Sequence, residues 1–167
     1  MRLLAGHLTV DDLDSFLAVV EGIATGTDTT VQAFDADYVV SEAHLRRAVE
    51  RADRAIARGE NVARDRAVEI LCYAAGRRQI NQALEMGVSA GENRVVLLVD
   101  SSAGDDAAED EAVDRLRDHI EPAELLGEYD EATVRSFFDV GDAELAAVDG
   151  SLADLVLERV ALLDVEK

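Results

Sequence analysis

The sequence predicts an α/β (α+β) fold, a small sheet surrounded by predominating helices. Short apolar or period-2 segments alternate with longer segments of helical spacing, and the helical segments outnumber the extended ones. The 167 residues and an apolar fraction of 49% match one compact domain, and no stretch is long enough to act as a linker. We therefore expect a single domain over residues 1–167.

In the first part of the chain, strand and helix patterns follow one another closely. Extended segments are predicted at 2–10, 29–34 and 38–40. Between the first two, apolar residues at helical spacing follow Asp11 and Asp12. Gly22, Gly26 and Asp28 are predicted to end this helix.

The middle of the chain is predicted to be mainly helical. Ser41 is a predicted N-cap, and His44 stands at the position where a capping box has Glu. The helices predicted here are 42–56, 65–75 and 79–86. Gly76 separates the last two.

The last part of the chain is predicted to contain one strand and further helices. The apolar run 95–99 is the clearest strand, and residues 101–111 resemble a solvated loop. Pro122 marks a turn, and Ser151 is predicted to cap the final helix. The predicted helices are 112–120, 133–138, 142–148 and 152–163.

The chain is strongly acidic. It carries 36 Asp and Glu against 16 Lys and Arg, a formal charge of −20, and Lys167 is its only lysine. This balance is typical of a salt-accumulating halophile, in which molar salt shortens the screening length to about 3 Å. An acidic protein from a GC-rich genome is the alternative, and unfolding at low salt distinguishes the two.

The cysteine content and the hydropathy pattern predict a soluble cytoplasmic protein. Cys72 is the only cysteine, so no intramolecular disulfide forms. The acidic residues that follow Val10 interrupt any signal peptide, and no apolar run approaches the roughly 18 residues of a membrane span.

Signatures of enzymatic chemistry are missing from the sequence. There is no glycine-rich phosphate-binding motif, and His7, His44 and His119 lack the spacing of metal ligands. Cys72 lies on an apolar helix face, which favours an inert thiol. Adjacent acids are too common here to be informative. The sequence therefore predicts no enzyme, no cofactor and no metal.

One region stays basic in this acidic chain. Nine of the 15 arginines, with only five acids, fall between His44 and Gln82. Arg77 and Arg78 adjoin the helix break at Gly76, and Asn81 and Gln82 add amides that can contact base edges. Guanidinium groups bind phosphate by bidentate hydrogen bonds, so the pattern predicts an RNA-type anion site. Ordinary surface ion pairs are the alternative.

The residues from Ala67 to Leu84, closed by Gly87 and Val88, resemble the central signature of the TPRKB-type family, the small regulatory subunit of the KEOPS complex. Two further stretches agree in order and spacing, 32–37 before His44 and 158–165 near the C-terminus. KEOPS installs threonylcarbamoyl on the adenosine beside the tRNA anticodon. The resemblance implies a non-catalytic subunit that binds and stimulates the kinase-like ATPase of the complex and holds the 3′ CCA tail of tRNA.

The resemblance also assigns site residues. The RNA-contacting residues it implies are Arg77, Arg78, Gln79, Ile80 and Asn81, with Arg58, Arg64 and Arg66 as further candidates. Leu155 and Arg159 of the final helix are candidates for kinase contact, although Leu155 fits a core position equally well. Charge reversal at Arg77 and Arg78 is expected to weaken tRNA binding with little change in melting temperature.

Two other functions stay open at this point. A protein-only adaptor would keep the kinase contact and lose the RNA site to the acidic surface. An acid/base enzyme that uses carboxylates has no motif behind it.

Overall fold

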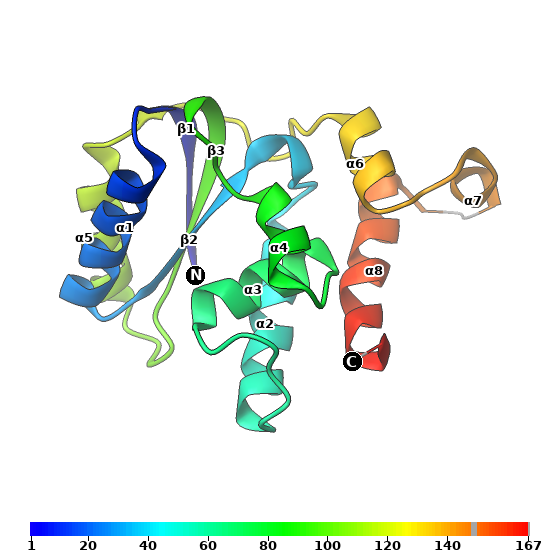
Figure 1. Cartoon of the computed structure of the whole chain (residues 1–167), viewed down its shortest axis with the longest axis horizontal. Helices are drawn as coiled ribbons and strands as arrows, with labels where there is room; N and C mark the ends of the chain where they lie inside the picture. The colour runs from blue at the N-terminus through cyan, green and yellow to red at the C-terminus, as the bar shows by residue number, and fades with distance from the viewer. Residues whose placement is uncertain (148–149, 167) are drawn as a thin grey trace. The chain divides into compact units, whose positions relative to one another are not determined.

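The computed structural model describes residues 1–147 and 150–166, and its elements are labelled in Figure 1. The strands are β1 (Arg2–Val10), β2 (Thr30–Asp35), β3 (Gly91–Asp100) and β4 (Glu121–Pro122). The α-helices are α1 (Leu13–Thr27), α2 (Glu42–Ala57), α3 (Arg66–Ala75), α4 (Ile80–Ala83), α5 (Asp106–Arg117), α6 (Glu131–Phe137), α7 (Asp142–Ala147) and α8 (Leu152–Glu166). The 3-10 turns are η1 (Ala36–Tyr38) and η2 (Leu84–Met86). The predicted α+β class with predominating helices is confirmed.

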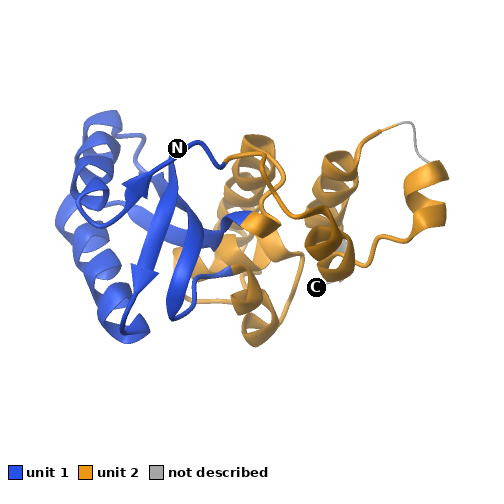
Figure 2. Cartoon of the chain, turned by 90° about the horizontal axis from the view of Figure 1, so that it is seen from above, with its two compact units in different colours: residues 1–36, 87–125 blue, residues 37–86, 126–167 orange. Residues whose placement is uncertain are grey.

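The chain divides into two compact units (Figure 2). Unit 1 comprises Met1–Ala36 and Gly87–Leu125, and unit 2 comprises Asp37–Met86 and Leu126–Lys167. Each unit is therefore assembled from two separate segments of the chain. The single domain over residues 1–167 stays a prediction.

Unit 1 contains the sheet. Its strand order is β2-β3-β1-β4, and every pair is antiparallel, with Arg2 opposite Val99 and Val10 opposite Gly91. Alternate residues of β1, among them Leu4 and Leu8, are buried in a core shared with α1 and α5, which lie on one side of the strands (Figure 1). The period-2 pattern of the strand thus reflects one face packed against helices.

Three boundaries in unit 1 differ from the sequence prediction. Gly22 and Gly26 lie inside α1, which ends at Thr27, and Asp28 adopts a left-handed φ of 54°. The predicted loop 101–111 is wrong beyond Asp105, because the Asp105 side chain accepts the Ala108 N–H and starts α5. Pro122 lies in β4, beside β1, and does not form a simple turn.

Two of these differences arise because a helix tolerates the glycines of α1 and is stabilised by the acids of α5. A glycine inside a helix costs only about 1 kcal/mol relative to alanine, which the burial of Val20 and Ile23 against the sheet offsets. Acidic side chains at 106–111 look solvated, yet acids in the first turn of a helix stabilise its positive end.

Unit 2 is helical within its described residues, and α2 packs against α3 and α8. The residues of α3 from Glu69 to Ala75 are all buried, so this helix is covered on every side in its second half. The predicted extended segment at 38–40 is wrong, since Tyr38 ends η1. The predicted helix 142–148 is confirmed to Ala147, and Val148 lies outside the described residues.

The N-cap of α2 is confirmed, and His44 completes it in an unexpected way. Ser41 Oγ accepts the His44 N–H at 3.2 Å. The buried His44 ring accepts the Val40 N–H at Nδ1 (3.3 Å), and its Nε2 donates to the Ala74 carbonyl of α3 (2.7 Å). Burial lowers the pKa of His44 to about 4. A neutral imidazole therefore joins the start of α2 to the end of α3.

Candidate functional site

The break at Gly76 begins the site. Gly76 has a φ of 61°, and the N–H groups of Gly76 and Arg77 bond to the carbonyls of Tyr73 and Cys72. This is a Schellman-type end, which requires a left-handed residue and favours glycine. The chain then turns into α4 at Ile80, so the residues from Arg77 onward leave the buried helix for the surface.

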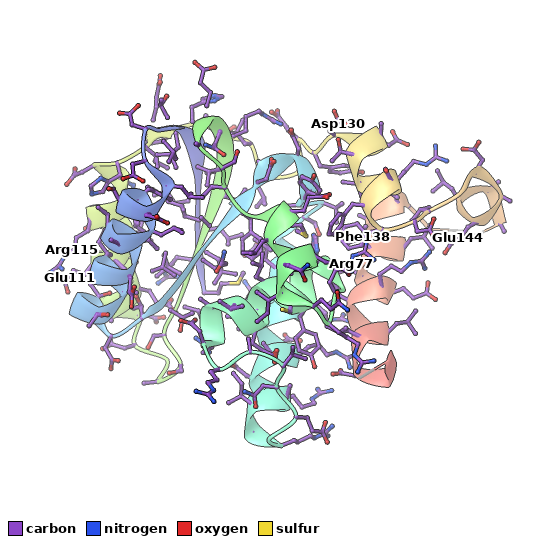
Figure 3. The ribbon with its side chains drawn as sticks, viewed as in Figure 1. Arg77, Glu111, Arg115, Asp130, Phe138 and Glu144 are labelled. Atoms are coloured by element: carbon purple, nitrogen blue, oxygen red, sulfur yellow. The ribbon has the colours of Figure 1, made fainter. Side chains whose placement is uncertain are left out.

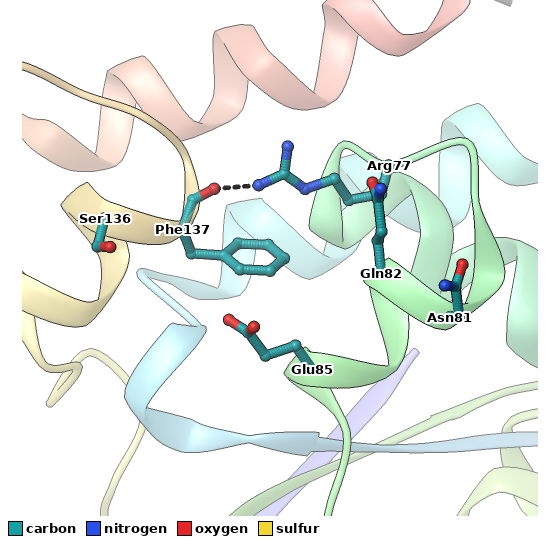
Figure 4. A pocket seen from close by; sticks show the side chains of 6 residues that line it. All are labelled: Arg77, Asn81, Gln82, Glu85, Ser136 and Phe137. Atoms are coloured by element: carbon teal, nitrogen blue, oxygen red, sulfur yellow. Dashed lines mark hydrogen bonds between the residues drawn. The ribbon is translucent and has the colours of Figure 1, made fainter.

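A cavity of about 540 Å³ opens beside this turn (Figure 4). Its lining residues are Arg77, Asn81, Gln82, Glu85, Ser136 and Phe137. The first four come from the segment after Gly76, and the last two come from α6. The volume lies within the range of small-ligand sites, roughly 300–1,000 Å³. Sequence reasoning found Arg77, Asn81 and Gln82 but not the α6 wall, for which no local motif exists.

Arg77 bridges the two walls of the cavity. It is half-buried, and its Nη2 donates to the Phe137 carbonyl oxygen, as the dashed line in Figure 4 shows. Its guanidinium carbon lies 4.7 Å from the centroid of the Phe137 ring, which is a cation–π distance. Arg77 therefore holds part of the fold together. Charge reversal at Arg77 is expected to lower the melting temperature, contrary to the expectation from the sequence.

The opposite edge of the cavity is acidic. The Glu85 carboxylate accepts a hydrogen bond from Tyr38 Oη at 3.1 Å, and in Figure 4 it lies on the other side of the Phe137 ring from Arg77. Asn81 and Gln82 supply two exposed amides, and Ser136 supplies a hydroxyl. One cation, one anion, amides and an aromatic ring suit a polar, planar ligand better than an isolated phosphate.

The other predicted RNA contacts fall into two groups. Arg78, Gln79 and Ile80 are exposed next to the cavity without lining it, and Ile80 retains 39% of its surface. Arg58 and Arg64 are exposed in the segment between α2 and α3, and neither forms an ion pair with any described residue.

Several arginines of the basic region form ion pairs within the chain. Arg66 donates to both carboxylate oxygens of Asp53, at 2.8 and 2.9 Å. Arg46 bonds to Glu42 at 2.8 Å. The alternative of ordinary surface pairing therefore holds for these two arginines, and Arg66 is the weakest of the predicted RNA contacts.

The segment that carries Arg58 and Arg64 is fastened by a buried carboxylate. Glu69, fully buried in α3, accepts the Val62 N–H at 3.0 Å with each oxygen and the Ala63 N–H at 3.4 Å. These backbone groups belong to the loop itself. No local sequence pattern indicates this role, because the backbone donors of the loop approach Glu69 only in the folded chain.

Replacing Glu69 with Gln is expected to lower the free energy of unfolding by about 1 kcal/mol, because one of the two acceptor oxygens is lost. Urea unfolding measures the change. The matched control is Glu60→Gln, an exposed glutamate of the same loop, which is expected to leave stability unchanged. Equal effects of the two substitutions would show that the buried contact is dispensable.

The residues proposed for partner contact lie on α8 in different settings. Leu155 is only 3% exposed and is a core position. Arg159 donates from Nε to the Phe138 carbonyl (3.1 Å) and from Nη2 to the Asp139 carbonyl (3.3 Å) and to Glu144 (2.8 Å). The Ser151 cap is confirmed, because its Oγ accepts the Asp154 N–H at 3.3 Å.

The outward face of α8 carries apolar and acidic side chains together. Leu162 is 38% exposed, and Leu157 and Ala161 are half-buried beside the exposed Glu158. Amphipathic surface helices carry mainly polar side chains on this face. Leu157 and Ala161 lie one turn apart, and Leu162 adds an exposed apolar side chain beside Ala161, an arrangement typical of a surface that another protein covers.

The described residues carry neither a metal cluster nor a membrane helix. No group of three or more His, Cys, Asp or Glu side chains among them is placed to hold a metal ion. No helix in the described part of the chain is long and apolar enough to cross a bilayer. Cys72 is buried and is not part of a disulfide.

The family model described as kinase binding protein CGI-121 matches residues 13–164, which cover most of both units. No curated protein matches the chain.

Proposed function

The chain belongs to the CGI-121 family of kinase-binding proteins, and on that premise we propose that it is a non-catalytic subunit of the KEOPS complex. The resemblance to the TPRKB-type family is thereby confirmed, since the two are the same family. In this role it binds and stimulates the kinase-like ATPase and holds the 3′ CCA tail of tRNA. The cavity of about 540 Å³ beside the Gly76 turn carries the RNA part of this proposal.

The chemistry of the cavity supports a base of the tail as its ligand. Cytosine and adenine both carry an exocyclic amino group, which donates to a carboxylate such as Glu85, and ring nitrogens that accept from the amides of Asn81 and Gln82. Ile80 and Leu84, 39% and 55% exposed and one helical turn apart, offer an apolar edge for a neighbouring base.

Exposed arginines support the backbone contacts. Arg58, Arg64 and Arg78 are all exposed in the same unit as the cavity, and Arg58 and Arg64 are available to phosphates. High salt weakens phosphate contacts by removing the gain from counterion release. In a halophilic cytoplasm we therefore assign most of the tail affinity to stacking and base-edge hydrogen bonds inside the cavity.

The kinase contact is assigned to the outward face of α8. Family membership supplies the occupant, a kinase, and Leu157, Ala161 and Leu162 supply the apolar surface. Leu155 is too buried to contact a partner without repacking the helix. Arg159 remains a candidate for the edge of this face.

Replacing Asn81 and Gln82 together with Ala is expected to weaken binding of intact tRNA roughly 30-fold or more, because two base-edge contacts are lost and each is worth at least about 1 kcal/mol. Both side chains are exposed, so the melting temperature is expected to stay unchanged. The measurement is the affinity at high salt for tRNA with and without its CCA end. Arg46→Ala, an exposed arginine paired with Glu42 outside the cavity, is the control.

The protein-only adaptor is the second candidate, and the Glu85 carboxylate at the cavity favours it because it repels phosphate. Equally weak binding of both tRNA forms, with kinase binding intact, would support the adaptor and remove the RNA role.

A further inference from the structure

Two arginines from different segments hold the end of α6. Arg77, which follows α3, donates to the Phe137 carbonyl, and Arg159 of α8 donates to the Phe138 and Asp139 carbonyls. The last carbonyls of a helix have no partner within the helix and carry its negative partial charge. Two guanidinium groups therefore cap three consecutive carbonyls at this helix end.

Arg159 is itself firmly held. The hydrogen bond from Arg159 lowers the pKa of the Glu144 carboxyl, which lies in α7, beyond the segment that Arg159 caps. Figure 3 labels Arg77, which follows α3, Phe138 at the end of α6 and Glu144 in α7, all in unit 2. The backbone of Arg159 also packs on the turn that starts the site, because a Cβ placed on Gly76 would lie 3.5 Å from the Arg159 carbonyl oxygen.

We infer that Arg159 is a positioning residue for the cavity. It fixes the end of α6 at Phe138 and Asp139, and the neighbouring Phe137 forms one wall of the cavity. Phe137 in turn contacts Arg77 through its carbonyl and its ring. The position of the end of α6 therefore sets the position of Phe137 and of Arg77, which belong to the two walls of the cavity. This role is separate from any partner contact of Arg159, and the identity of the ligand rests on the proposed function.

The test compares Arg159→Ala with Arg51→Ala. Arg51 anchors α8 through Asp164 at 2.9 Å, yet it forms no hydrogen bond to α6 among the described residues and does not line the cavity. It therefore serves as the matched control for a loosened α8. Arg159→Lys is the conservative variant, since it keeps the charge but loses the fork that spans two carbonyls.

Two readouts are taken at a salt concentration where all variants are folded. The first is hydrogen exchange of the amides of Phe138, Asp139 and Val140, which bond to carbonyls in the last turn of α6. In Arg159→Ala they are expected to exchange about tenfold faster, while Arg51→Ala leaves them unchanged. The second is affinity for the tRNA tail, which is expected to fall about fivefold in Arg159→Ala and less in Arg159→Lys.

The outcomes separate this inference from the proposed function. Unchanged exchange in Arg159→Ala, or equal changes in both alanine variants, overturns the positioning role whatever the ligand is. Faster exchange in Arg159→Ala with unchanged affinity for the tRNA tail also overturns the positioning role, provided that Asn81→Ala lowers this affinity. If wild-type protein does not distinguish tRNA with and without CCA, the proposed RNA function fails, and the exchange readout still decides whether Arg159 holds the end of α6.

Discussion

Replacing Leu157 and Leu162 with glutamate is expected to abolish binding of the kinase-like partner, with a loss of affinity of about 100-fold or more. Leu162 is 38% exposed on the outward face of α8, and Leu157 is half-buried at the edge of that face. A charge placed at the centre of an apolar contact must be desolvated without a partner, which is far costlier than losing the contact alone. Titration calorimetry with the purified kinase-like subunit measures the effect.

Two further variants make this experiment decisive. Leu162→Glu alone tests the exposed position without disturbing the half-buried Leu157, and circular dichroism checks that α8 stays folded. Leu17→Glu places the same charge on a leucine that is 46% exposed on α1 in unit 1. Kinase binding is expected to survive Leu17→Glu. Intact binding by the α8 double variant would place the partner on another surface.

Acidification is expected to destabilise the protein through His44. The pKa of this buried imidazole is about 4 in the folded protein and 6.5 as a free side chain. The unfolded chain therefore takes up a proton below pH 6.5, whereas the folded protein does so only near pH 4. The contribution of His44 is fully present above pH 6.5 and is lost as pH falls, by about 1.4 kcal/mol per pH unit and about 3 kcal/mol in total.

Urea unfolding at constant high salt, at pH 7 and pH 5, measures this loss. His44→Gln removes the titrating group and keeps a donor for the Ala74 carbonyl. This variant is expected to be less stable than wild type at pH 7. Between pH 7 and pH 5, its free energy of unfolding is expected to fall by about 2 kcal/mol less than that of wild type. His119→Gln, at an exposed position, is expected to show the wild-type pH dependence. A wild-type dependence in His44→Gln as well would show that carboxylates alone set the acid response.

The local signals in the sequence predicted most helix and strand positions. Ser41 and Ser151 were identified as caps because a cap is a contact between residues three positions apart. The apolar run Val95–Val99 was predicted as a strand, and all five residues are fully buried. The errors at 38–40 and 106–111 arose where the same residue types suit two conformations, and tertiary packing selected between them.

Of the two walls of the candidate site, the sequence predicted only the one formed by the segment after Gly76. The turn at Gly76 and the amides that follow were identified from their sequence, since glycine and a helix break are local features. The α6 wall was missed, and the functions of Arg77, Arg159 and Leu155 could not be separated. Each of these side chains fits a surface or a core position equally well until its neighbours are known.

The fold class, the acidic surface and the turn from Gly76 to Asn81 could therefore be predicted before folding is considered, because they depend on composition and on neighbours within one helical turn. The contact of Arg77 with Phe137, sixty residues away in the chain, and the capping of the same helix end by Arg159 arise from long-range packing. A cavity wall and a helix cap supplied from a distance depend on how helices pack. That packing is fixed by the burial of many apolar side chains at once, and no short segment records it.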